Sequence, residues 1–106
     1  MNDRELLEMA AKAAGRKIVR WGKTDGAFID QGSCWSPLTD DGDALRLAAN
    51  LRLEIIPGKH VGDGCSVNSK RHQAPGVTVF RDSKDMAEQI RRAVVMCAAE
   101  IGRSME

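Results

Sequence analysis

The sequence predicts an α+β domain in which three helices pack on a small, mainly antiparallel sheet of four to five strands. Three segments repeat apolar residues at helical spacing, and short runs with strand character lie between them. Two of these runs are close enough to form a hairpin, which favours antiparallel pairing over a wound parallel sheet. The expected order is α-β-β-α-β-(β)-β-α, where the bracket marks a short, optional strand.

Length, charge and cysteine content limit the class of protein. A chain of 106 residues has the length of one domain, so residues 1–106 are treated as a single unit. The net charge of +1 gives no general attraction to nucleic acid or membranes, and no window approaches the ~18 apolar residues of a membrane span. Three cysteines without close pairing and a charged N-terminal segment lead us to expect a cytoplasmic protein with free thiols.

The first helix is expected over Asn2–Ala14. Asn2 can cap its first turn with Glu5 as the reciprocal partner, and Gly15 supplies the left-handed residue that often ends a helix. Alternating and β-branched residues predict the strands. These are expected at Lys17–Trp21, Gly26–Asp30, Leu51–Ile56 and Gly76–Phe80, with Cys65–Ser69 as the optional strand.

The second helix begins in an acidic run, Asp40 to Asp43, which raises the question of a metal site. Clustered carboxylates suit a hard cation, but an EF-hand loop spreads its ligands over about twelve residues. Aspartates also satisfy the unpaired N–H groups of a helix start. We therefore interpret the run as a helix start at Asp40 or Asp43, with the helix ending at Ala49 and Asn50 in the left-handed exit position.

The third helix is expected to begin at Asp82 or Ser83 and to end at Gly102. Its apolar residues recur at helical spacing and include Cys97, which we interpret as a packed core thiol.

Metal binding and catalysis find little support in the residue pattern. Zinc ligands usually occur as closely spaced pairs, and the remaining Cys and His residues have irregular spacing. No G-x-S-x-G elbow or phosphate-binding glycine loop is present. We therefore expect no cofactor, no metal and no enzyme activity. The weak metal candidates are Cys34, His60, Cys65 and His72.

Partner contact has better candidates. Trp35, just before Pro37, is either an exposed recognition anchor or a hydrophobic lid over the helix start, and the lid is the simpler interpretation. Basic residues offer a second kind of contact, to anions or phosphates. The partner-binding candidates are Trp35, His60, Lys70, Arg71 and His72, and a further basic group comprises Arg16, Lys17, Arg20 and Lys23.

The chain also resembles small proteins of tailed phages and prophages, namely the phage alpha-beta-alpha sandwich domain, in which a Trp-x-Pro segment leads into an acidic helix start. This resemblance implies a phage origin and no particular activity. We expect a non-enzymatic accessory protein that binds a host or phage protein; the alternatives are a nucleic-acid- or nucleotide-binding accessory protein and a small metal-dependent enzyme. The matching positions are Trp35, Pro37, Asp40, Asp43, Ala44 and Leu47.

Overall fold

The computed structural model describes residues 2–21, 27–29, 33–58, 64–69, 76–79 and 85–105. Within them the chain forms three helices and six strands, whose order follows the predicted one with an additional strand before the second helix. The elements are α1 (Asp3–Ala14), β1 (Ile18–Trp21), β2 (Ala27–Ile29), β3 (Ser33–Trp35), α2 (Asp41–Leu51), β4 (Glu54–Ile56), β5 (Cys65–Asn68), β6 (Val77–Val79) and α3 (Met86–Ser104).

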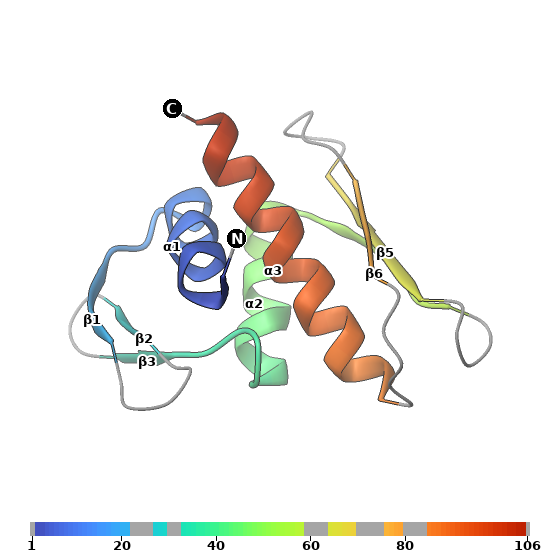
Figure 1. Cartoon of the computed structure of the whole chain (residues 1–106), viewed down its shortest axis with the longest axis horizontal. Helices are drawn as coiled ribbons and strands as arrows, with labels where there is room; N and C mark the ends of the chain where they lie inside the picture. Colours follow the sequence, from blue (N-terminus) through green and yellow to red (C-terminus); the bar gives the residue numbers. More distant parts are fainter. Residues whose placement is uncertain are drawn as a thin grey trace.

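The strands form two antiparallel sheets, each of three strands in the order β1-β2-β3 and β4-β5-β6. The first sheet lies on one side of α3, with α1, and strands β5 and β6 lie on the other side (Figure 1). The α+β class, the three helices and the antiparallel pairing are therefore confirmed. The single sheet of four to five strands is replaced by two smaller sheets, because the strands before and after α2 do not pair with each other in the described residues.

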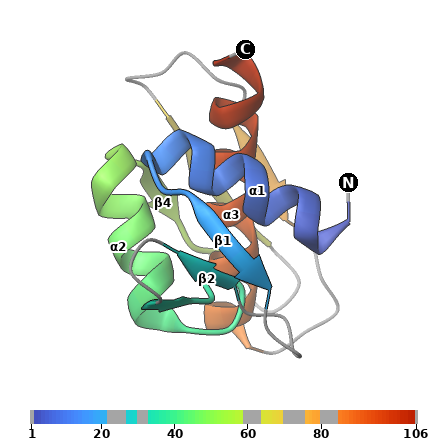
Figure 2. The same cartoon turned by 90° about the vertical axis from the view of Figure 1, so that its left-hand side faces the viewer.

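Helix α3 is the centre of the fold. Ala93, Val94, Val95, Cys97 and Ala98 are all fully buried, and at 3.6 residues per turn these positions span more than half of the circumference of the helix. Its neighbours are α1, α2, β5 and β6. In the view of Figure 2, α1 and the sheet β1-β2-β3 face the reader and α3 lies behind them. The core is thus built around one helix and not between a sheet and a helical layer.

The contact between α1 and α3 depends on a glycine inside α3. A Cβ atom added to Gly102 would lie 2.0 Å from the backbone oxygen of Met9 in α1. Only a residue without a side chain permits this close approach of two backbones. The prediction that Gly102 ends the helix is therefore wrong: α3 continues to Ser104, and Gly102 is a buried packing position.

Capping residues fix the helix starts. The Asn2 Oδ1 accepts a hydrogen bond of 2.9 Å from the Glu5 N–H, and Gly15 ends α1 with φ of 72°, both as predicted. Asp85 caps α3 and has extended backbone angles, so the helix begins at Met86 and not at Asp82 or Ser83, two residues that lie outside the described part of the chain.

The end of α2 also differs from the prediction. Asn50 lies within the helix, and Arg52 takes the left-handed position with φ of 55°. Leu51 is 3% exposed and packs in the core as a helical residue, and this burial extends the helix beyond Ala49. The following strand is accordingly short, Glu54–Ile56.

Candidate functional site

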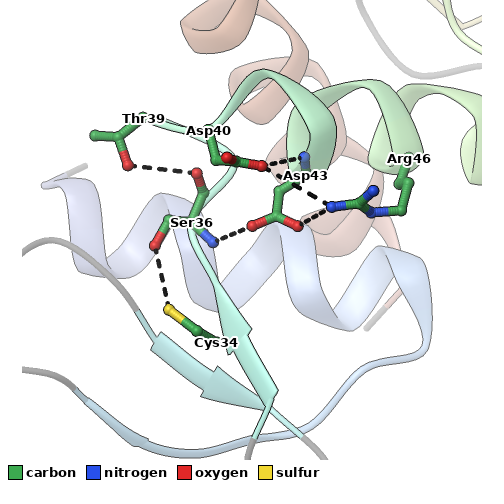
Figure 3. A network of polar contacts seen from close by, with 6 residues as sticks. All are labelled: Cys34, Ser36, Thr39, Asp40, Asp43 and Arg46. Carbon is green, nitrogen blue, oxygen red and sulfur yellow. Dashed lines mark hydrogen bonds and ion pairs between the residues drawn. The ribbon is translucent and has the colours of Figure 1, made fainter.

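The acidic run forms the N-terminus of α2 and is held by a polar network (Figure 3). Asp40 is the N-cap: its Oδ2 accepts a hydrogen bond of 2.8 Å from the Asp43 N–H. The Asp43 Oδ2 accepts one of 2.9 Å from the Ser36 N–H, which ties the preceding segment to the helix. The predicted helix start is confirmed, with Asp40 as the cap.

Two arginines complete the network. Arg46 donates to the Asp43 Oδ1 at 2.8 Å and lies 3.9 Å from the Asp40 Oδ2. The hydrogen bond to Asp43 and the charges of Asp43 and Asp40 raise the pKa of Arg46 above its ordinary value. Arg91 of α3 contacts the Asp41 carboxylate and also donates to the Leu38 carbonyl oxygen at 3.0 Å.

The three carboxylates thus face N–H groups and guanidinium groups of their own chain. A hard cation would have to displace these donors from the carboxylate oxygens. Within the described residues, no three Cys, His, Asp or Glu side chains are grouped so as to hold a metal ion. The run is therefore a structural feature that fixes the position of α2.

Trp35 is buried, with 7% of its surface exposed, and belongs to the core cluster. This burial fits the interpretation of Trp35 as a hydrophobic lid better than that of an exposed recognition anchor. Pro37 is fully buried as well. The Trp-x-Pro segment therefore contributes to folding, as the lid interpretation expects.

The metal candidates do not converge in the described residues. Cys34 lies exposed in β3, and Cys65 lies buried in β5 of the other sheet, on the opposite side of α3. His60 and His72 lie outside the described residues. Burial raises the pKa of the Cys65 thiol, and burial together with the charge of Glu100 raises that of Cys97, the predicted core thiol.

The predicted basic contacts are only partly placed. Arg16 and Lys17 are exposed after α1. For the other basic candidates, either the whole residue or its side chain lies outside the described part of the chain. These candidates are Arg20, Lys23, His60, Lys70, Arg71 and His72.

A surface groove that the sequence did not indicate lies where α2, α3 and β4 meet. Its volume is about 230 Å³, and its lining is aliphatic except for the Asp41–Arg91 ion pair at one place. Leu45 lies at this groove and is 67% exposed, the most exposed large apolar side chain among the described residues. The lining residues are Asp41, Ala44, Leu45, Ile55, Ala87, Ile90, Arg91 and Val94, and we call this feature the α2–α3–β4 groove.

Sequence reasoning missed the groove because exposure of one leucine depends on how neighbouring elements pack. The available signal was local: Leu45 lies beside the buried stripe of Ala44, Leu47, Ala48 and Leu51 and not within it. A large aliphatic residue at the edge of such a stripe is a candidate for contact outside the core.

The fold and the groove define the class of the protein: an α+β domain with a central helix, two flanking three-stranded antiparallel sheets and an apolar groove on its surface. No family model matches the chain, and no curated protein or solved structure is significantly similar to it. The resemblance to small phage proteins therefore stays a prediction. Among the described helices, none has the length and apolarity needed to cross a bilayer.

Proposed function

We propose that this protein acts without catalysis, by contact with another polypeptide at the α2–α3–β4 groove. The exposed Leu45 at the lip of an aliphatic groove carries the proposal. Exposed apolar side chains gathered around a hollow are typical of protein contact sites, where a few central residues supply most of the binding energy.

The shape and chemistry of the groove favour a polypeptide over a small molecule. Ligand pockets usually enclose about 300–1,000 Å³ and carry several convergent polar groups. This groove is smaller, about 230 Å³, and its charged groups, Asp41 and Arg91, already pair with each other. Inserted aliphatic side chains would fit such a space and would need no polar partner.

The class of partner is inferred from the resemblance to phage proteins. This resemblance makes a host or phage-encoded protein the expected partner, and it makes the bacterial cytoplasm the expected place of action. A phage accessory protein that works by contact needs a surface of this kind, and the groove supplies one.

A photo-cross-linking experiment tests the proposal. Leu45→p-benzoylphenylalanine places the cross-linker at the groove, and Thr78→p-benzoylphenylalanine places it on an exposed site of β6, in a different part of the molecule. Irradiation of the purified variants and of bacterial extracts containing them should give a discrete protein adduct from the Leu45 variant alone. Adducts from neither variant, or the same adducts from both, would contradict the proposal.

A further inference from the structure

The C-terminal ends of α1 and α2 meet at one corner of the molecule. Asn50, near the end of α2, donates a hydrogen bond of 3.4 Å from its Nδ2 to the carbonyl oxygen of Ala14, the last residue of α1. Figure 2 shows these two helix ends side by side. Two segments that are 36 positions apart in the chain thus share one surface.

Both helices separate their charges along their length. The acidic residues of α1 all lie in its first half, and those of α2 lie in its first turn. Residues 9–21 and 44–53, which include the two helix ends, contain no Asp or Glu. The shared surface therefore collects basic residues that are exposed, or partly exposed in the case of Lys12. We define the basic corner as Lys12, Gly15, Arg16, Lys17, Asn50 and Arg52.

The basic corner carries more positive charge than the helix ends require. One cation near each C-terminus would complement the partial negative charge of the two helix dipoles, and the corner has four. The nearest described acids along the chain are two, Glu8 before Lys12 and Glu54 after Arg52. An excess of basic side chains therefore remains at the surface.

Three of the four cations also interact within the chain, namely Lys12, Arg16 and Lys17. Interactions of cations at the surface are individually weak and are screened by salt. A phosphate group can therefore join these interactions or replace them. Arg52 is exposed as well, and its backbone position is fixed by its role as the left-handed cap of α2.

The side chains of the corner favour phosphate over other anionic partners. None of its six residues has a large apolar side chain, whereas protein interfaces and membrane-binding surfaces depend on aromatic or aliphatic anchors. None is aromatic, and single-stranded nucleic acid is held largely by stacking on aromatic rings. Basic groups without such anchors are typical of contacts to the phosphates of a duplex, which carry no sequence information.

We infer that the basic corner binds the phosphate backbone of double-stranded nucleic acid, without sequence selectivity. The charge is local, so the net charge of +1 for the whole chain does not oppose it. This function goes beyond the proposed contact with a protein and does not depend on it. The α2–α3–β4 groove uses the first half of α2, and the corner uses the end of the same helix.

Fluorescence anisotropy of a short labelled DNA duplex measures binding by the purified full chain. The wild type should bind with a micromolar Kd at roughly 50 mM salt, and its affinity should fall steeply by roughly 200 mM salt. A plot of log affinity against log salt concentration should have a slope of about −3, as expected for three to four phosphate contacts. A duplex of different sequence should bind equally well.

Substitutions at the corner test its role. Arg16→Gln and Arg52→Asn should each weaken binding by about 10-fold at roughly 50 mM salt and reduce the salt slope by about 1. Asn tolerates the left-handed backbone at position 52, where φ is 55°. Arg92→Gln is the matched control: it removes the same charge at the opposite end of α1, where Arg92 pairs with Asp3. It should bind as the wild type does, and circular dichroism verifies that each variant is folded.

The outcomes either support the inference or overturn it. Losses of affinity and of salt slope that are confined to the two corner variants support it. Absence of duplex binding at the lowest salt overturns it, and so does an equal loss in Arg92→Gln, which would show an effect of net charge alone. Tighter binding of a single strand also overturns it. So does binding to vesicles of equal parts phosphatidylcholine and phosphatidylserine without binding to the duplex. The Leu45 cross-linker reports on a different surface, so its result stands or falls separately.

Discussion

The strongest test of the fold is the substitution Gly102→Ala in α3. A Cβ atom at this position would lie 2.0 Å from the carbonyl oxygen of Met9 and 2.8 Å from its carbonyl carbon. Real Cβ contacts are not found below 3.0 Å, so α1 and α3 must separate by about 1 Å to admit one methyl group. Because the opposing atoms belong to the backbone, no side-chain rotation can relieve the overlap.

Two opposing terms set the size of the effect. Overfilling a packed core costs about 1–3 kcal/mol, and a backbone clash belongs at the upper end of that range. Alanine is the better helix former, by up to about 1 kcal/mol relative to glycine. We therefore expect a net loss of about 2 kcal/mol in the free energy of unfolding. For a domain of this size, that loss lowers the melting temperature by roughly 10 °C.

Urea unfolding followed by far-ultraviolet circular dichroism measures this loss, with Gly42→Ala as the matched control. Gly42 is also helical, but the atoms nearest to its added Cβ are the ends of the Arg46 and Asp40 side chains, at 3.2 Å. These side-chain ends need to shift by only a few tenths of an ångström, so the control should stay within about 1 kcal/mol of the wild type. If Gly102→Ala behaved like this control, the close approach of α1 and α3 would be refuted.

Three further predictions concern the polar contacts and the thiols. Arg91→Met removes the contacts of α3 to the start of α2 and should lower the free energy of unfolding by about 1–2 kcal/mol, measured by urea unfolding. Arg103→Met loses one exposed ion pair and should change the free energy of unfolding by less than about 0.5 kcal/mol. Equal effects of the two substitutions would contradict the assigned roles. Cys34 should react with Ellman's reagent in the folded protein, while Cys65 and Cys97 should react only on unfolding, and rapid reaction of all three would show that the core is open. Burial raises the pKa of Cys97 in the folded protein, so the unfolded chain loses this thiol proton at a lower pH than the folded protein does. The free energy of unfolding should therefore hold below a pH of about 8.5 and fall above it. The fall should be less steep in Cys97→Ala.

Features that depend on residues within about one helical turn of each other could be predicted from the sequence. Asn2 and Asp40 cap helices because their side chains reach N–H groups three residues further along. Gly15 ends α1 because a glycine tolerates the left-handed backbone. Each of these contacts involves only near neighbours, so the residue type and its position were sufficient evidence.

Features that depend on distant residues were mispredicted. Gly102 has the same chemistry as Gly15, yet Met9 makes it a packing position instead of a helix end. The burial of Leu51 carries α2 past the expected exit and leaves Arg52 in the left-handed position. The same applies to the division of the strands into two sheets, since strand pairing is not determined by local spacing.

The acidic run and the groove are connected through the rigidity of α2. Asp43 ties the helix start to the preceding segment, and Arg91 ties it to α3, so the first turn of α2 is fixed on two sides. The backbone at Leu45, which follows within one turn, is therefore fixed before any partner binds. Binding costs less when the backbone of the contacting residue is already positioned, because less conformational freedom is lost. The structural role of the acidic run thus supports the contact role that we propose for the groove, although none of its carboxylates needs to touch the partner's apolar side chain.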